Sequence, residues 1–226
     1  DGIASRGLGD VYKRQVISYE EMLEMASLGA KVMQPVSIQD ARLNRIGIEV
    51  KSSFIKKPGT LITKRTNLNN NRIITGISLT HNDAKVTLVG VKDRPGVAAS
   101  IFKPLSINSI NVDMVVQNIS ANGKETDLTF TIKAEDLNKT KKIIQENKKI
   151  NFKKVLFQKG VSKISIIGVG MITTPGVTFR MFQALANKKI NIQVISTSEI
   201  KISVLINKKD AKKALATLHK EFKLQK

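Results

Sequence analysis

The alternation of apolar and polar positions first becomes regular at residue 16, where it predicts the start of a helix. Ser18, followed three residues later by Glu21, forms a capping box, and Ile17 and Met22 occupy the positions of a hydrophobic staple. The helix is expected to end near Gly29, because glycine commonly closes a helix.

The next segment predicts a second helix and a strand. The helix is expected after Ser37, over residues 37–46, with its end at Gly47, and residues 48–54 are expected to form the strand. Residues 56–72 are polar and rich in Asn, Lys and Thr, which favours a linker. Two helices and one strand cannot bury both of their faces alone, so this segment is interpreted as the tail of a larger α/β domain.

An internal repeat occupies the rest of the chain, with residues 86–115 matching residues 164–195. Several residues recur at one constant offset: Pro95, Gly96, Phe102, Leu105, Ile110 and Asn111 correspond to Pro175, Gly176, Phe182, Leu185, Ile190 and Asn191. Each copy continues with an alternating strand and a lysine-rich helical stretch, and a final short strand is expected at residues 154–157 of the first copy.

Each copy therefore predicts the order strand, helix, strand, strand, helix, strand. In the first helix the apolar residues recur every three to four positions, so one face is expected to pack on a sheet. In the third strand, residues 128–132, large apolar residues alternate with threonine, which predicts one buried side and one open side. The fold class is α+β, with two tandem ferredoxin-like βαββαβ units, an architecture more typical of small-molecule sensing or pairing than of catalysis.

Composition excludes several kinds of chemistry. The absence of cysteine removes disulfides, thiol catalysis and cysteine-ligated metals, and it fits a reducing cytoplasm. His81 and His219 are far apart in sequence and do not by themselves make a zinc centre, so no metal site is expected. No apolar run approaches the roughly 20 residues of a membrane span, so we expect no membrane partner and a cytoplasmic location.

The charge balance is strongly basic, since 38 Lys and Arg against 18 Asp and Glu give a formal net charge of +20. Such a charge is typical of nucleic-acid-binding proteins. However, the basic residues are mostly lysines in scattered pairs, and aromatic residues make up only 4% of the chain. Base readout favours arginine, and single strands need aromatic stacking. We therefore expect a solvated lysine-rich surface and no specific nucleic-acid partner.

Several sequence blocks together resemble one known family. GVKDRPGVAASIF and INSINVDMVVQNIS in the first copy, and TTPGVTFRMF and NIQVISTSEIKISVLI in the second, are similar to the paired ACT domains of aspartate kinase. ISYEEMLEMASLGAKVMQP resembles the closing stretch of that enzyme's amino-acid-kinase domain. The resemblance covers residues 16–226 and does not include the family's glycine-rich and lysine-rich nucleotide loop or its aspartate-binding residues.

The resemblance implies a domain order along the chain. Residues 1–15 match nothing in the family and are interpreted as a truncated or artefactual start. The remaining expected parts are a C-terminal remnant of an amino-acid-kinase domain at 16–64, a linker at 65–80, a first ACT domain at 81–158 and a second ACT domain at 159–226.

Asp93 precedes Pro95 and Gly96 at a predicted turn from strand to helix, and two roles are open for it. As a helix N-cap, its carboxylate would accept hydrogen bonds from the first backbone N–H groups. By the resemblance, it would instead meet the ammonium of an effector amino acid, whose carboxylate the free N–H groups of the helix would receive. The second copy has Thr173 and Thr174 in place of the acid, so the two units are not expected to bind equivalently.

The resemblance implies a wider effector site where two such units pack edge to edge. Its residues are Asp93, Ala98, Asn111, Val112, Asp113 and Gln117 from the first unit and Val177, Thr178, Asn191, Ile192, Ser198 and Glu199 from the second. Taken singly, each would be interpreted as a packing or turn residue. The expected effector is lysine, threonine or both.

Lys31 also has two open roles. It suits the carboxyl end of a helix dipole, and by the resemblance it would contact a nucleotide phosphate. ATP and Mg²⁺ are implied only for the full-length family enzyme, because phosphoryl transfer needs a phosphate cradle, a metal-holding carboxylate and a substrate clamp together. No catalytic residue is expected in this chain, which alone is expected to be inactive.

Three functions are open at this point. The first is aspartate kinase, an enzyme of lysine, threonine and methionine biosynthesis, with this chain as its allosteric, amino-acid-sensing portion. The second is a non-catalytic ACT regulatory subunit of that enzyme, and the third is a basic nucleic-acid-binding protein. The expected macromolecular partner is a second copy, through ACT–ACT pairing, or a catalytic subunit.

Overall fold

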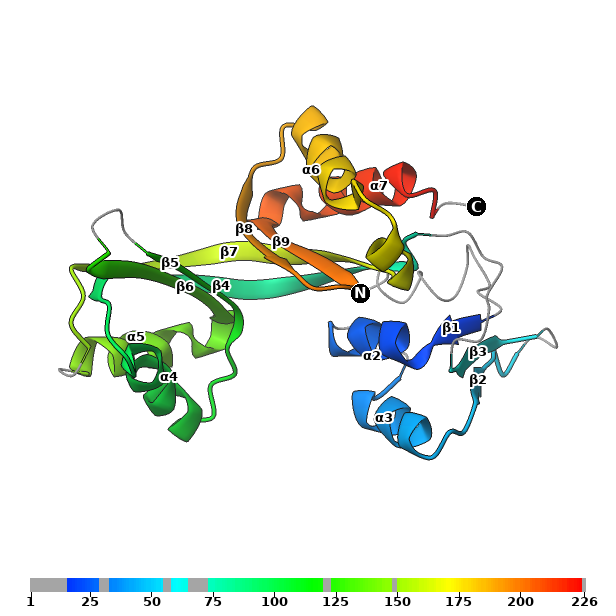
Figure 1. The fold of residues 1–226 in the computed structure, drawn as a ribbon, viewed down its shortest axis with the longest axis horizontal. Helices are drawn as coiled ribbons and strands as arrows, with labels where there is room; N and C mark the ends of the chain where they lie inside the picture. Colours follow the sequence, from blue (N-terminus) through cyan, green and yellow to red (C-terminus); the bar gives the residue numbers. More distant parts are fainter. Residues whose placement is uncertain are drawn as a thin grey trace.

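The computed structural model describes residues 16–28, 33–54, 58–64, 73–119, 123–147 and 150–224. A three-stranded sheet with two helices lies beside a long six-stranded antiparallel sheet that carries two helix pairs (Figure 1). This arrangement confirms the predicted α+β fold with two ferredoxin-like repeats.

The amino-terminal part has one small hydrophobic core of its own. Its sheet has the order β1–β3–β2, with β1 at Val16–Ser18, β2 at Ile48–Val50 and β3 at Thr60–Thr63. Helix α2 (Tyr19–Ser27) starts with the predicted capping box, in which the side chains of Ser18 and Glu21 each accept a hydrogen bond from the other's backbone N–H. Ile17 and Met22 are buried in the same core, as the staple predicts.

Two expectations for this part are wrong. Helix α3 (Pro35–Leu43) begins before Ser37, because Pro35 takes the first helical position, where its missing N–H is not needed. The expected linker at 56–72 contains β3, which is the central strand of the small sheet. The four residues of β3 are too few to stand out as a period inside a segment rich in Lys and Asn.

The large sheet has the order β5–β6–β4–β7–β9–β8. Its strands are β4 (Gly76–Lys92), β5 (Asp113–Ile119), β6 (Glu125–Lys133), β7 (Lys154–Ile167), β8 (Ile192–Thr197) and β9 (Lys201–Asn207). Strands β4 and β7 run through both repeats as one long antiparallel pair. The expected linker at 65–80 is therefore wrong at its end, because residues 76–80 form strand and pair with residues 163–167.

Each repeat places two helices on one face of this sheet. Helices α4 (Val97–Ile107) and α5 (Leu137–Glu146) belong to the first unit, and α6 (Val177–Asn187) and α7 (Ala211–Glu221) to the second. Figure 1 shows the two pairs on opposite sides of the β4–β7 pair. Each helix pair covers one hydrophobic core. In the core of the first unit, the rings of Phe102 and Phe130 meet edge to face with centroids 5.3 Å apart.

The helix-free faces of the two units meet near the middle of the long strand pair. Met114 of β5 packs there with Val161, Val194 and Leu205 of the second unit. Thr131 was expected on an open side, but it is only 2% exposed, and its hydroxyl donates to the backbone carbonyl of Asp113 at 3.0 Å. That expectation is wrong because the alternation of one strand does not show what the other repeat covers.

Among the helices in the described ranges, we find none that is both long and apolar enough to cross a membrane.

Candidate effector site

The turn before α4 presents backbone N–H groups without a side-chain cap. Gly96 is the N-cap residue, with a φ of 85° in the left-handed region, and within the described residues no side-chain hydrogen bond caps this helix. Asp93 is half-buried and donates its backbone N–H to the carbonyl of Lys124 at 3.0 Å. The N-cap role of Asp93 is therefore wrong, because Gly96, three residues further along the chain, occupies the N-cap position.

The second unit repeats this turn without the acid. Gly176 is the N-cap of α6 with a φ of 88°, again with no side-chain cap. A short 3₁₀ turn, η2 (Val169–Thr173), leads into it, and Thr173 and Thr174 stand where the first unit has Asp93. The two turns therefore have the same backbone conformation at the N-cap glycine and differ in charge.

Strand register divides the sequence-predicted residues of the first unit into two groups. Thr126 of β6 pairs with the ends of both β4 and β5, so Gln117 lies at the same end of the sheet as the Asp93 turn. Asp113 pairs with Thr131, about 17 Å further along β6 at ~3.3 Å per residue. One group is Asp93, Ala98 and Gln117, and the other is Asn111, Val112 and Asp113.

The residues of the second unit divide in the same way. Val177 and Thr178 begin α6 at the end of the sheet that also carries the β8–β9 turn, where Ser198 donates its backbone N–H to the Lys201 carbonyl at 2.7 Å. Glu199 is exposed in that turn. The other two residues, Asn191 and Ile192, lie at the far end of β8.

Two surface hollows contain members of these groups. One, of about 440 Å³, lies between α2 and the second unit and is lined by Ser18, Glu20, Val169, Ile172, Ser198, Glu199 and Ile200. The other, of about 260 Å³, lies along α4 and is lined by Phe102, Ser106, Ser109, Ile110, Asn111, Val112 and Val115. These two hollows are separate from each other, and the expected enclosure of one ligand between paired units remains a prediction.

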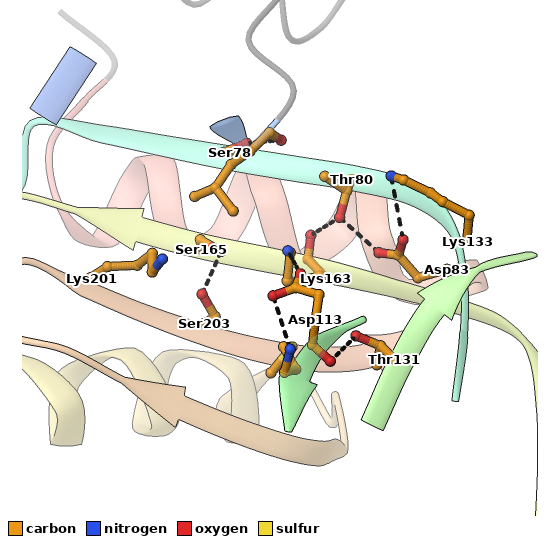
Figure 2. A network of polar contacts seen from close by, with 12 residues as sticks. Ser78, Thr80, Asp83, Asp113, Thr131, Lys133, Lys163, Ser165, Lys201 and Ser203 are labelled. Atoms are coloured by element: carbon orange, nitrogen blue, oxygen red, sulfur yellow. Dashed lines mark hydrogen bonds and ion pairs between the residues drawn. The ribbon is translucent and has the colours of Figure 1, made fainter. Parts of the chain in front are cut away.

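Asp113 is held by the second unit. The Lys163 ammonium of β7 donates to Asp113 Oδ2, and the backbone N–H of Met114 donates to Oδ1 at 2.9 Å (Figure 2). The Lys163 side chain is 9% exposed and that of Asp113 is 59% exposed. The pair therefore joins a buried ammonium to a carboxylate that also reaches solvent.

A second ion pair joins the second unit to the amino-terminal part. Lys201 of β9 donates to Glu24 Oε2 of α2 at 2.8 Å. Burial alone would raise the pKa of Asp113, but the hydrogen bond and charge of Lys163, the Met114 N–H and the charge of Lys201 hold that pKa below its ordinary value of 3.8. Sequence reasoning missed Lys163, Lys201 and Glu24, because lysines of a basic chain look like surface residues.

We expect Asp113 to make the protein more sensitive to acid. Because its folded-state pKa is lowered, the carboxylate contributes stability above its unfolded-state pKa, near 4, and this contribution is lost as pH falls through the folded-state pKa. Asp113→Asn should therefore flatten the decline of the unfolding free energy below about pH 4. Urea denaturation between about pH 3 and 7 measures it, with Asp40→Asn on the surface of α3 as control. Equal slopes in both variants would contradict the assignment.

Glu21 fixes α2 to the second unit. Its carboxylate is buried and accepts hydrogen bonds from the backbone N–H of Ser18 at 3.2 Å, from the Thr75 hydroxyl and from the backbone N–H of Val169 at 3.1 Å. The Leu28 carbonyl accepts another from the Ser78 hydroxyl at 2.7 Å. Sequence reasoning recognised Glu21 only as a capping residue. Lys31, three residues beyond Leu28, lies outside the described residues, so its two roles stay predictions.

Comparison with known proteins agrees with this architecture. A family model described as "ACT domain" matches residues 86–147 and 164–222, which are the two repeats. An aspartate kinase of Pseudomonas fluorescens (strain SBW25) is 45% identical over 92% of this chain and 51% of its own length. The crystal structure of the regulatory subunit of aspartate kinase from Thermus thermophilus (ligand-free form) is 34% identical, with a TM-score of 0.62 over 67% of this chain and 99% of that one.

A more distant structure shares the fold. The structure of E. coli aspartokinase III in complex with lysine and aspartate (T-state) has a TM-score of 0.74 and 24% identity over 93% of this chain and 46% of that one. The fold and the family match make this chain a protein with paired ACT domains. More particularly, it belongs to the aspartokinase family, of which it is a C-terminal regulatory portion. It spans about half the length of the curated relatives that it matches, 51% in the first case.

Proposed function

We propose that this chain senses an amino acid and thereby regulates an aspartate kinase, the enzyme that transfers the γ-phosphoryl group of ATP to the β-carboxylate of aspartate. The observation that carries the proposal is the turn before α4, where a half-buried Asp93 lies beside a helix start without a side-chain cap. A free amino acid is a zwitterion, so it needs an acceptor for its ammonium and N–H donors for its carboxylate. This turn supplies both.

Lysine is the effector that we favour, alone or with threonine. The support for lysine is the E. coli aspartokinase III complex, a protein of the same fold, whereas threonine rests on the sequence resemblance. The remaining members of the two residue groups complete the proposed site when units pair. The edge strands β5 and β8 have no hydrogen-bonded neighbour on their outer sides within the described sheet. Such edges favour pairing with a second copy or a catalytic subunit.

We assign ATP and Mg²⁺ to the rest of the full-length enzyme. In the described part of the chain no group of three or more His, Cys, Asp or Glu is placed to hold a metal ion, and Lys31 lies outside that part. The described residues therefore do not fit a nucleotide–metal site. We expect this chain alone not to phosphorylate aspartate and to act in the cytoplasm with its enzyme.

A non-catalytic regulatory subunit is the second candidate function. The observation in its favour is the match to the Thermus thermophilus regulatory subunit, which extends over 99% of that protein. Both candidates assign amino-acid sensing to the same residues, so one binding experiment tests both.

The effector should stabilise the folded protein, because a ligand that binds only the native state raises the free energy of unfolding. At 100 times its dissociation constant, lysine or threonine should add about 2.7 kcal/mol, which a thermal melt resolves. Asp93→Ala should abolish the shift and, because Asp93 is not a helix cap, change the unliganded stability by less than about 0.5 kcal/mol.

The melts compare lysine, threonine, methionine and a non-effector amino acid, with Asp40→Ala as a control for loss of a distant carboxylate. A full shift in Asp93→Ala would remove Asp93 from the site. No shift with any amino acid in the parent protein would refute the sensing function.

A further inference from the structure

We propose that Asp127 of β6 is a positioning residue for the effector site, because its carboxylate fixes the backbone of β4 just before the Asp93 turn. It acts through Gly90, three residues before Asp93, and not by contact with the effector. This inference rests on the proposed function, since it takes the Asp93 turn as part of the effector site, and it adds what holds that turn in place.

The first support is a β-bulge in the strand that leads to the Asp93 turn. The pairing of β4 with β6 shifts between Leu88 and Val91, so two residues of β4 stand opposite Asp127 alone. One of the two is Gly90, whose φ of 64° is left-handed, as glycine often is at a bulge. A bulge leaves its extra residue without a ladder partner. Here Oδ1 of Asp127 accepts the Gly90 N–H at 2.8 Å, so a side chain takes the place of a ladder carbonyl.

The second support is that the bulge sets the register of the segment that ends at Asp93. Beyond the bulge, Val91 and Lys92 pair with β6 again. Asp93 then donates its backbone N–H to the Lys124 carbonyl at 3.0 Å. A slip of one residue would turn every side chain of this segment to the other face, although Val91 is fully buried in the core of the first unit. Loss of the hydrogen bond that closes the bulge therefore releases the register on which the Asp93 turn depends.

The face on which Asp127 lies shows that it does not share the effector's side of the sheet. Its neighbour Leu128 is 1% exposed in the core that α4 and α5 cover, so Asp127 points to the helix-free face. Gln117 of the predicted effector site pairs with Leu128, and directly paired residues point to the same face. Asp127 and Gln117 thus lie on opposite faces, as expected of a positioning residue and a contact residue.

The third support is that the second unit has the same glycine without the acid. Gly168 corresponds to Gly90 in the repeat, but its φ of 174° is extended, and its N–H donates to a backbone carbonyl of the β8–β9 turn at 2.9 Å. The strand registers place Lys201 where the first unit has Asp127, and Lys201 binds Glu24 of α2 instead. Of the two units, only the one with the acidic turn therefore has a side-chain acceptor at this glycine.

Three variants separate the hydrogen bond at the bulge from other effects. Asp127→Ala removes the acceptor, so it should bind lysine or threonine at least about tenfold more weakly than the parent. Asp127→Asn keeps an oxygen at the same place and should restore the affinity to within about threefold of the parent. Thr129→Val is the matched control, because the Thr129 hydroxyl joins β6 to the Thr87 hydroxyl of β4 at 3.1 Å, on the same face but away from the bulge. Its affinity should equal that of the parent.

Isothermal titration calorimetry of the full chain with L-lysine and L-threonine measures these affinities. Weaker binding by Asp127→Ala, with recovery in Asp127→Asn and unchanged binding by Thr129→Val, supports the inference. If the parent binds an amino acid and Asp127→Ala binds it equally well, or if Asp127→Asn or Thr129→Val is as weak as Asp127→Ala, the positioning role is refuted while the sensing function stands. If the parent binds neither amino acid, the sensing function fails and the inference fails with it.

A measurement on the unaltered protein covers the case in which Asp127→Ala does not fold. In protein labelled with ¹⁵N at glycine, nuclear magnetic resonance follows the exchange of the Gly90 N–H with deuterated water. If the effector binds only when the bulge is closed, L-lysine or L-threonine at about ten times its dissociation constant should slow this exchange about tenfold. An unchanged exchange rate at Gly90, with the effector bound, refutes the positioning role.

Discussion

Glu21→Ala should lower the free energy of unfolding by about 3 kcal/mol, a large effect for one polar side chain. The buried carboxylate accepts hydrogen bonds from the N-cap residue Ser18, from Thr75 before β4 and from Val169 in η2. Alanine would leave the buried Ser18 N–H and the two part-buried donors without this partner, and an unsatisfied buried donor costs about 1–3 kcal/mol. The loss should fall on the junction between the amino-terminal part and the second unit.

Urea denaturation gives the change in free energy, and amide hydrogen exchange locates it. Exchange should accelerate in α2 and around Thr75, and remain slow in β6 of the first unit. Glu20→Ala is the control, because Glu20 is adjacent and its ion pair with Arg42 is exposed, at 3.6 Å. Exposed pairs contribute at most about 1 kcal/mol. Equal denaturation curves for Glu20→Ala and Glu21→Ala would show that Glu21 does not hold the junction.

Phe130→Ala should lower the free energy of unfolding by about 4 kcal/mol. Phe130 is fully buried at the centre of β6, and its ring packs edge to face against Phe102. Truncation removes apolar contacts and leaves a cavity between the sheet and α4 that the close-packed core cannot fill. Because β4 and β7 run through both units, the loss of stability should also affect the second unit. The protein should therefore still unfold in one transition.

Thermal melts followed by circular dichroism test this expectation. Phe179→Ala provides the matched control, since Phe179 is 68% exposed on α6 and its loss should change stability by less than about 1 kcal/mol. A loss below about 1.5 kcal/mol for Phe130→Ala would mean that the core of the first unit is packed differently. Two separate transitions would contradict the shared strand pair.

The elements that could be predicted from sequence are those whose signals are local or repeated. The capping box at Ser18 and Glu21 is a local motif, and the helix forms with that cap. The two repeats are visible because they share Pro, Gly and apolar positions, and both fold as ferredoxin-like units. The family follows from the same residues, and the family match covers both repeats.

The features that could not be predicted depend on contacts between distant segments. Residues 76–80 are too few to define a period by themselves, and as a strand they pair with residues 163–167. The sequence could not show whether Asp93 caps the helix, because only the backbone conformation shows that Gly96 is the N-cap residue, in a left-handed conformation.

The candidate site also depends on a contact between distant segments that the sequence does not show. Asp113 was predicted from the resemblance, but its partner Lys163 lies 50 residues away in a chain rich in lysine. No local pattern distinguishes a buried lysine from the many exposed ones. The pairing depends on the contact between the helix-free faces of the two units, which the sequence of one repeat does not contain.

Amide hydrogen exchange with and without saturating L-lysine or L-threonine tests most directly whether the paired ACT units sense an amino acid. A bound ligand slows exchange where it orders the backbone or accepts its N–H groups. We expect slower exchange at residues 93–98 and 111–117, with α7 unchanged as the internal reference. Unchanged exchange in both segments, at a concentration of each amino acid that would saturate a millimolar site, would contradict the account.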